Sequence, residues 1–217
     1  MNNDNSNISL TLSNETTYQG LPVQYKFKPL ILEYLTGIWD TIGFAVTDHH
    51  ETYAVRVDLN FPEGRRYDTN VVITKFFASL KAQIENNIIA RRRGGVRVHD
   101  CKLRYVWVRE KNSSVNHHFH VLLFLNKQTY NTIGNINHDQ GNMSARIRKA
   151  WASALGCSYE EAKKGVHFPK NRNYFLNYKL PTFPQEVAAL IYRASYMAKL
   201  YSKDFTDGKR NFGRSQN

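Results

Sequence analysis

The spacing of apolar and polar residues changes several times along the chain, and each change predicts an element. Residues 30 to about 46 carry apolar side chains at helical spacing, whereas residues 52–61 alternate strictly, which predicts a strand. The apolar face of that strand carries large side chains: Tyr53, Val55, Val57, Leu59 and Phe61. The other face carries small or polar side chains: Thr52, Ala54, Arg56, Asp58 and Asn60. We therefore expect one side of the strand to face water, as an antiparallel sheet allows.

The middle of the chain predicts a helix followed by a hairpin. An amphipathic helix is expected over residues 69 to about 90, and the basic run 91–93 with the two glycines after it ends this helix. Two strands follow, at about 103–110 and 117–125. The polar residues between them are typical of a turn, so the two strands should pair as a hairpin.

Three further elements complete the series: a basic helix over residues 142–155, a short strand at 166–169 and a long helix over 184–203. The resulting order predicts an α+β fold. We expect a four- or five-stranded antiparallel sheet with helices on one face, similar to the ferredoxin or RNA-recognition layout. The last helix would be free to lie near the open face of the sheet, where we expect the active site.

The length of the chain suits one folded domain with an arm at each end. Residues 1–20 are rich in Asn, Ser and Thr and have few large apolar groups, so a flexible polar arm is expected. The folded domain should span 21–203. Residues 204–217 are again polar and carry basic side chains, which predicts a flexible basic tail.

The charge of the chain favours a polyanionic partner. There are 30 Lys and Arg against 18 Asp and Glu, a formal net charge of +12, and nucleic acid is the partner that such a balance most often serves. No apolar run is long enough for a membrane span and no signal-peptide pattern is present, so we expect a cytoplasmic protein that binds no membrane. Cys101 and Cys157 form no CxxC pair, which leaves a zinc ribbon or a disulfide framework without support.

A pair of histidines begins the second strand of the predicted hairpin. Because side chains alternate along a strand, His118 and His120 share one face while Phe119 points to the other. Glu110, on the preceding strand, can lie beside them. Two imidazoles and a carboxylate leave positions open for water or a phosphate oxygen and suit Mn²⁺ or Mg²⁺, with zinc possible. The alternative interpretation is a solvated strand end with a hairpin ion pair.

The last predicted helix has two different faces. Its core face carries Val187, Leu190, Ile191, Ala194, Ala198 and Tyr201. Tyr192, Tyr196, Lys199 and Lys203 fall on nearly the opposite side. A phenol, with a pKa of about 10, is a weak nucleophile at neutral pH, but a nearby metal and an ammonium group stabilise the phenolate. Tyr196 and Lys199 are therefore candidates for a nucleophile and its charge stabiliser, unless the tyrosines simply pack on a neighbouring element.

With these two elements, the sequence resembles the HUH endonucleases, the rolling-circle replication initiators and their relatives. The motifs that carry the resemblance are His118-Phe119-His120 and the YxxK sequence from Tyr196 to Lys199. Within that superfamily the sequence is similar to the phage and prophage family of the YagK/YfjJ C-terminal, or inovirus replication-type, domain. Four phrases carry this similarity: YAVRVDLNFP, YVWVREKN, HHFHVLLFLN and YRASYMAK.

The resemblance implies a metal-dependent DNA endonuclease, or nickase, and strand transferase that initiates rolling-circle-type replication of a phage or mobile element. In such proteins the histidines and an upstream acidic residue bind Mg²⁺ or Mn²⁺, and the tyrosine forms a 5′-phosphotyrosyl bond while releasing a 3′-hydroxyl. Two-tyrosine initiators have the spacing of Tyr192 and Tyr196, so Tyr192 is either a second nucleophile or a positioning group. A separate helicase would open the duplex, and a polymerase would extend the 3′-hydroxyl.

On this interpretation the substrate is single-stranded or hairpin DNA. Tyr196 attacks the backbone, a divalent cation polarises the phosphate, and Lys199 neutralises the developing charge. The candidates for DNA contacts are polar or basic side chains: Arg56, Asp58, Asn60, Arg91, Arg92, Arg93, Arg146, Arg148, Lys149 and Lys203. Each of these charges is equally consistent with a solvated surface.

Two other functions fit parts of the sequence. A non-catalytic nucleic-acid binder with an RNA-recognition-like sheet would explain the charge and the aromatic content, but it predicts aromatic side chains on the open sheet face. The strand at 52–61 instead has Arg56, Asp58 and Asn60 there. A metal-dependent phosphodiesterase that activates water is the second alternative, and it needs no tyrosine.

Overall fold

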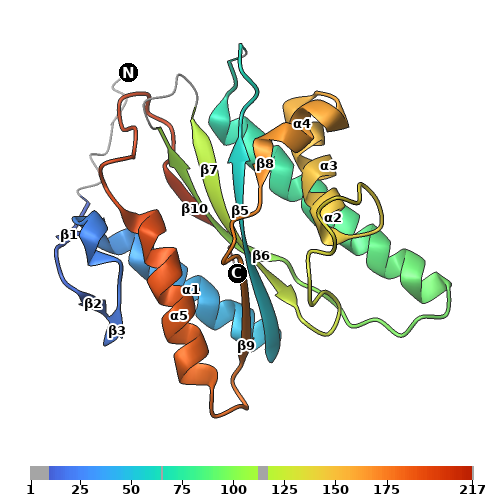
Figure 1. The fold of residues 1–217 in the computed structure, drawn as a ribbon, viewed down its shortest axis with the longest axis horizontal. Coiled ribbons are helices and arrows are strands. Elements are labelled where there is room, and N and C mark those ends of the chain that lie inside the picture. Colours follow the sequence, from blue (N-terminus) through green and yellow to red (C-terminus); the bar gives the residue numbers. More distant parts are fainter. Residues whose placement is uncertain (1–9, 65, 112–116, 217) are drawn as a thin grey trace, which may run out of the picture.

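A six-stranded antiparallel sheet forms the centre of the structure (Figure 1). The computed structural model describes residues 10–64, 66–111 and 117–216. The strands of the sheet are β5 (Glu51–Asn60), β6 (Arg104–Glu110), β7 (His118–Asn126), β8 (Val166–His167), β9 (Asn173–Asn177) and β10 (Phe212–Arg214). Their order is β10-β6-β7-β5-β8, and β9 pairs with the same edge of β5 nearer its start. The expected α+β class and antiparallel pairing are confirmed, but the described sheet has six strands rather than the expected four or five.

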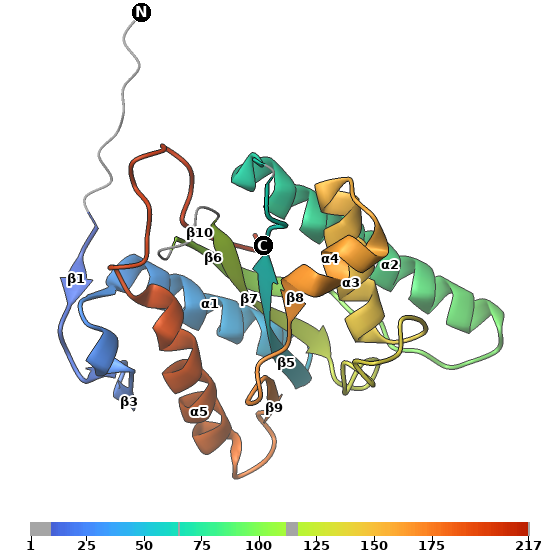
Figure 2. The ribbon, with the colours of Figure 1, turned by 45° about the horizontal axis from the view of Figure 1, so that its top comes forward.

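One face of the sheet is covered by α2 (Thr69–Arg93), α3 (Met143–Leu155) and α4 (Tyr159–Gly165), as Figure 2 shows. The apolar face of β5 points into this layer, as its alternation predicts. Trp151 is fully buried there, with its ring against those of Phe61 and Phe76. Asp68 begins α2 by accepting hydrogen bonds from two backbone N–H groups of the first turn. This half of the core is therefore built from elements that the hydrophobic pattern of the sequence predicts.

The other face of the sheet is also covered, by α1 (Leu32–Asp48) and α5 (Phe183–Ser195). The expectation of helices on one face only is therefore wrong. Thr52 and Ala54, assigned to a water-facing side of β5, are completely buried. Their small side chains let α1 approach, and the Thr52 hydroxyl donates hydrogen bonds to the carbonyl oxygens of Ala45 and His49.

Both chain ends are more ordered than the composition predicts. β1 (Leu12–Ser13) pairs with β4 (Leu30–Ile31), and β2 (Thr17–Tyr18) pairs with β3 (Leu21–Pro22), ahead of a 3₁₀ turn, η1 (Tyr25–Phe27). At the other end, β10 adds an edge strand to β6. The flexible arm expected over 1–20 and the flexible tail over 204–217 are therefore wrong for residues 10–20 and 204–216. Residues 1–9 and 217 lie outside the described part of the chain.

A buried arginine explains why the tail is held. The Arg109 guanidinium is fully buried, lies 2.6 Å from the Asp207 carboxylate and donates to the side-chain oxygen of Asn211 at 2.9 Å. Its backbone N–H donates to the Asn211 carbonyl. A buried charge is costly unless it is paired. Apart from the Thr69 hydroxyl, the groups that accept hydrogen bonds from the Arg109 guanidinium come from the tail, so the tail folds with the domain.

The last helix ends earlier than its apolar pattern predicts. We expected helix from 184 to 203, but α5 ends at Ser195 and a 3₁₀ turn, η2 (Tyr196–Ala198), follows. At Lys199 the backbone is extended, Lys199 forms a bridge with Leu30, and the Leu200 N–H donates to the Pro29 carbonyl. Pairing with this earlier segment replaces the helical hydrogen bonds. Within the described residues, no helix has the length and apolar content needed to cross a membrane.

Candidate metal centre and tyrosine site

Strand register places the predicted ligands side by side. In the β6–β7 hairpin Glu110 lies opposite His118, and in the β5–β7 pair Asp58 lies opposite His120. One nitrogen each of His118 and His120 and one carboxylate oxygen of Glu110 all lie within 4.8 Å of one another. The turn of the hairpin falls at 112–116, outside the described residues. The sequence prediction that these three side chains converge is met by the geometry.

Two lysines hold the Glu110 carboxylate. Lys203 donates to Oε1 at 2.6 Å, and Lys199 makes a short hydrogen bond to Oε2. All three side chains are almost completely buried. Burial by itself would raise the pKa of Glu110, but the ammonium charges of Lys203 and Lys199 lower it well below its usual range. Burial also lowers the pKa of Lys203 to about 8.

His120 is oriented by a carboxylate on the neighbouring strand. Its Nδ1 lies 2.6 Å from Oδ1 of Asp58, while Nη2 of Arg56 lies 3.0 Å from the same nitrogen. The short contact with a charged acceptor assigns the proton to Nδ1, which leaves the lone pair on Nε2. Nε2 is buried and has no hydrogen-bond partner among the described residues, although it lies 3.2 Å from Oε2 of Glu110. A buried acceptor without a donor, beside a carboxylate and a second imidazole, fits a divalent cation.

We expect Asp58→Asn to weaken Mn²⁺ binding by about 10- to 100-fold, as loss of such an orienting carboxylate typically does. An asparagine amide in this place donates to Nδ1 and moves the imidazole proton to Nε2, which removes the ligand lone pair. Isothermal titration calorimetry measures the effect. Asp100→Asn is the control, because Asp100 is exposed and pairs with Arg92. Equal Mn²⁺ affinity of the Asp58→Asn variant and the wild-type protein would contradict the assignment.

His118 should make the fold sensitive to acid. Burial lowers its pKa from 6.5 to about 4. The unfolded chain therefore takes up a proton at higher pH than the folded one, so stability falls as pH drops from 6.5 to 4. The shift corresponds to about 3 kcal/mol. In urea titrations with a chelator present, the His118→Asn variant should lose about that much less stability over this range, and parallel pH profiles would contradict the prediction.

The ring of Tyr196 lies against the same cluster. Its centroid is 5.6 Å from that of His120, and the Lys199 ammonium lies 3.5 Å from the ring centroid. Phe27 packs edge-on at 4.8 Å, and the Arg56 guanidinium lies 5.3 Å away. Burial and the Glu110 charge raise the pKa of Tyr196 in this arrangement. The hydroxyl is therefore neutral here, and its activation would need an added positive charge.

Several predicted site residues have other partners. Lys203 is paired with Glu110 and has no exposed side chain to offer a phosphate. Arg56 and Asp58 contact His120, and the Asn60 amide donates to the Gly165 carbonyl, although its side chain remains exposed. The role of Asp58 was missed because it depends on the β5–β7 register. The sequence feature that could have indicated this role is that Asp58 lies two residues after Arg56 and therefore on the same face of the strand.

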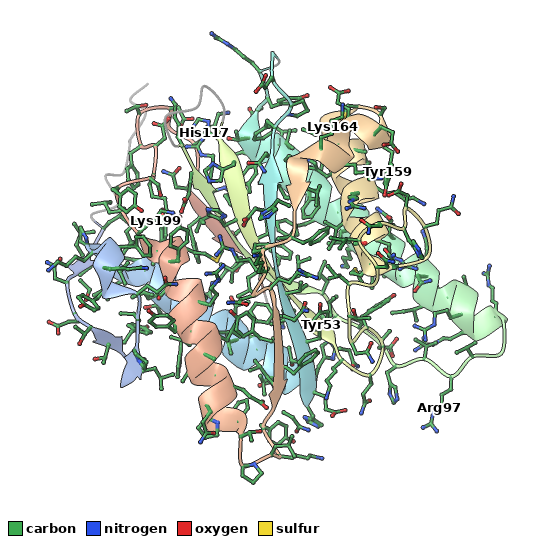
Figure 3. The ribbon with its side chains drawn as sticks, in the orientation of Figure 1. Tyr53, Arg97, His117, Tyr159, Lys164 and Lys199 are labelled. Atoms are coloured by element: carbon green, nitrogen blue, oxygen red, sulfur yellow. The ribbon has the colours of Figure 1, made fainter. Side chains whose placement is uncertain are left out.

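The other predicted DNA contacts lie away from the histidines. Figure 3 shows Arg97, just past the basic run 91–93, at the opposite end of the molecule from His117 and Lys199. On α3, which packs on the other face of the sheet, Arg148 is buried and donates to the Ile136 carbonyl. Its helix also carries Arg146, with its guanidinium 5.9 Å from the Tyr130 ring, and the exposed Lys149. The structure does not bring these groups to the cluster of Glu110, His118 and His120.

A second cluster, of His117, Asp204 and Asp207, has the composition of a metal site but different surroundings. Asp207 is paired with Arg109, and Lys111 lies 3.3 Å from Asp204. His117 Nε2 lies 3.0 Å from the Asp204 carboxylate. These cations already neutralise both carboxylates, so the cluster serves to fasten the tail.

Fold and site together define an α+β protein with an antiparallel sheet and a His-His-Glu cluster beside a tyrosine. The model of the YagK/YfjJ C-terminal domain matches residues 13–215, and the chain belongs to this family. It is 33% identical over 209 residues to the Escherichia coli K12 protein "Uncharacterized protein YagK", covering 92% of this chain and 98% of the relative. It is 31% identical over 195 residues to "Uncharacterized protein YfjJ" of the same strain, covering 84% and 93%. No solved structure matches the chain.

Proposed function

We propose that this protein is a metal-dependent DNA nickase and strand transferase of the HUH type, which initiates rolling-circle-type replication of a phage or mobile element. The observation that carries the proposal is the convergence of Tyr196 with His118, His120 and Glu110. These residues come from three separate parts of the chain. The Glu110 carboxylate lies beside both imidazoles, the two imidazole rings contact each other, and the His120 ring contacts the Tyr196 ring. Neither of the two alternative functions accounts for the tyrosine.

The strand order supports the same proposal. From β5 to β8 the elements run strand, helix, strand, strand, helix, strand, apart from the short α4, and the spatial order is β6-β7-β5-β8. We propose that this order is the split βαβ arrangement of ferredoxin-like folds, in which the two central strands are the first and third. The histidines lie on central strand β7, and Asp58 lies on central strand β5. A simple RNA-recognition-like binder would instead need an open sheet face, which α1 and α5 largely cover here.

The chemistry proposed for Tyr196 is a transesterification. The Tyr196 oxygen forms a bond to the scissile phosphorus and loses its proton to solvent, while the bond to the 3′-oxygen breaks and that oxygen leaves as a hydroxyl after taking up a proton. The products are a 5′-phosphotyrosyl bond and a free 3′-hydroxyl for a polymerase. A divalent cation held by His118, His120 and Glu110 would supply positive charge to the phosphate oxygens. Arg56 and Lys199, both beside the Tyr196 ring, contribute positive charge to the same region.

Incubation with end-labelled single-stranded DNA from the replication origin and Mn²⁺ tests the proposal. A covalent protein–DNA adduct that needs Mn²⁺ supports nicking through tyrosine. Release of two free fragments without an adduct would support hydrolysis by activated water, and retention of uncut DNA would support a binding protein. Either of these last results would overturn the proposal.

A further inference from the structure

A hollow of about 540 Å³ lies beside α5, one helical turn before Tyr196. It is formed by the second half of α5 and by the chain that leads into β9, and we name it the α5 hollow. Its principal lining side chains are Lys170, Arg172, Tyr174, Tyr192 and Arg193. Its volume lies within the range of about 300–1,000 Å³ that is usual for pockets holding organic ligands.

The α5 hollow concentrates positive charge without a counter-ion. None of its lining residues is acidic, and Lys170, Arg172 and Arg193 form no ion pair with any described residue. The Nε atoms of Arg172 and Arg193 are buried and have no hydrogen-bond partner within the described part of the chain. Three gathered cations repel one another, and unsatisfied buried donors cost free energy. Both costs are relieved by a polyanion.

The hollow also offers aromatic surface. The Tyr192 side chain is 45% exposed and makes no ring contact or hydrogen bond with any described side chain. Tyr174 is half-buried and fixed by the hydrogen bond from its hydroxyl to the Asn171 carbonyl at 3.2 Å. Exposed rings among unpaired cations are typical of sites that bind single-stranded nucleic acid, because bases stack on the rings and phosphates pair with the cations. The bases of a duplex are already stacked on one another and cannot stack on Tyr192.

The chain itself connects the α5 hollow to Tyr196. Tyr192 and Arg193 lie in the last turn of α5, directly before Tyr196, and the Arg56 guanidinium lies 5.3 Å from the Tyr196 ring. The backbone N–H of Arg56 donates to the carbonyl oxygen of Arg172 at 2.9 Å. The chain that lines the hollow is thus joined to β5, the strand that carries Asp58.

We propose that the α5 hollow binds the single-stranded DNA next to the scissile phosphate, with one base stacked on Tyr192 and phosphates held by Arg172 and Arg193. The inference rests on the proposed nicking function and assigns its substrate a path. It also treats Tyr192 as a positioning group that binds DNA rather than as a second nucleophile.

The test is the affinity for a fluorescein-labelled dT20 oligonucleotide, measured by anisotropy with a chelator present so that no cleavage occurs. Tyr192→Leu should weaken binding by about 5- to 100-fold, the usual effect of losing one stacking side chain. Tyr192→Phe, which retains the ring, should recover most of the loss. Tyr178→Leu is the matched control, because Tyr178 is similarly exposed and packs on His50, outside the hollow.

The cations have a separate readout. Arg172→Gln and Arg193→Gln should each reduce the slope of log affinity against log salt by about 0.7, the value for one phosphate contact on a single strand. Arg97→Gln, an exposed arginine far from the site, should leave the slope unchanged (Figure 3). Equal affinities of Tyr192→Leu and Tyr178→Leu would overturn the proposal, as would equal losses in Tyr192→Phe and Tyr192→Leu. Tighter binding of rU20 than dT20 would overturn the assignment to DNA.

These outcomes distinguish failure of the proposed DNA-binding role of the α5 hollow from failure of the proposed nicking function. If the hollow does not bind DNA but the protein is a nickase, the Mn²⁺-dependent adduct forms while Tyr192→Leu binds dT20 like its control. If the protein is not a nickase but the α5 hollow binds single-stranded DNA, no adduct forms, while the Tyr192 and arginine variants still show the predicted changes in dT20 affinity and salt dependence.

Discussion

Replacement of Glu110 by glutamine is expected to lower the free energy of unfolding by about 3–5 kcal/mol, the usual cost of removing one partner of a buried ion pair. Glutamine has nearly the same shape, so packing is preserved while the negative charge is lost. The ammonium groups of Lys199 and Lys203 would then remain buried without a counter-charge. Urea unfolding followed by circular dichroism in a chelator measures the change.

Two further variants identify the cause of that change. Glu85→Gln removes an exposed carboxylate that lies 3.9 Å from Lys81, and it should change stability by less than about 1 kcal/mol. Combining Glu110→Gln with Lys203→Met removes one of the two buried, unpaired ammonium charges and should recover part of the lost stability. A Glu110→Gln protein as stable as the wild type would show that the lysines do not depend on this carboxylate.

Tyr196→Phe is expected to abolish the covalent DNA adduct, with a loss of at least about 10³-fold in the rate of its formation, because no other group replaces the nucleophile. The phenyl ring preserves the contacts with Phe27, His120 and Lys199. Folding and Mn²⁺ affinity should therefore stay close to those of the wild-type protein. Gel analysis of adduct formation, with calorimetry for Mn²⁺ on the same preparations, separates chemistry from metal binding.

The outcome for Tyr192 sharpens this prediction. The Tyr192→Phe variant retains Tyr196 and should still form an adduct. If Tyr196→Phe formed the adduct at the wild-type rate, Tyr196 would not be the nucleophile, whatever its position beside His120.

Sequence patterns predicted the elements whose hydrophobic period is unambiguous. The alternation from 52 to 61 gave the bounds of β5 within one or two residues, and the hairpin prediction placed Glu110 opposite His118. These features follow from local geometry, because a strand repeats every two residues and a hairpin fixes its own register. The convergence of Glu110, His118 and His120 could therefore be predicted from the hairpin alone.

What sequence patterns missed depends on contacts between distant segments. The apolar period of the last helix continues past Ser195, but pairing of Lys199 with Leu30 stops the helix there. That change brings Lys199 to Glu110 instead of leaving it on an exposed helix face. The covered second face of the sheet and the ordered tail both come from contacts between distant segments. Thr52 is buried because α1 packs on it, and the tail is held by its contacts with Arg109 and by the pairing of β10 with β6. The hydrophobic pattern of a single segment does not predict which distant segment it will contact.

The most direct test of the central claim is the identity of the residue that becomes linked to DNA. Protein and origin DNA should be incubated with Mn²⁺, the adduct digested with trypsin and nuclease, and the modified peptide sequenced by mass spectrometry. We expect a nucleotide on the oxygen of Tyr196, and none when His120 is replaced by alanine. A nucleotide on any other residue, or an adduct that forms equally well without His120, would contradict the account.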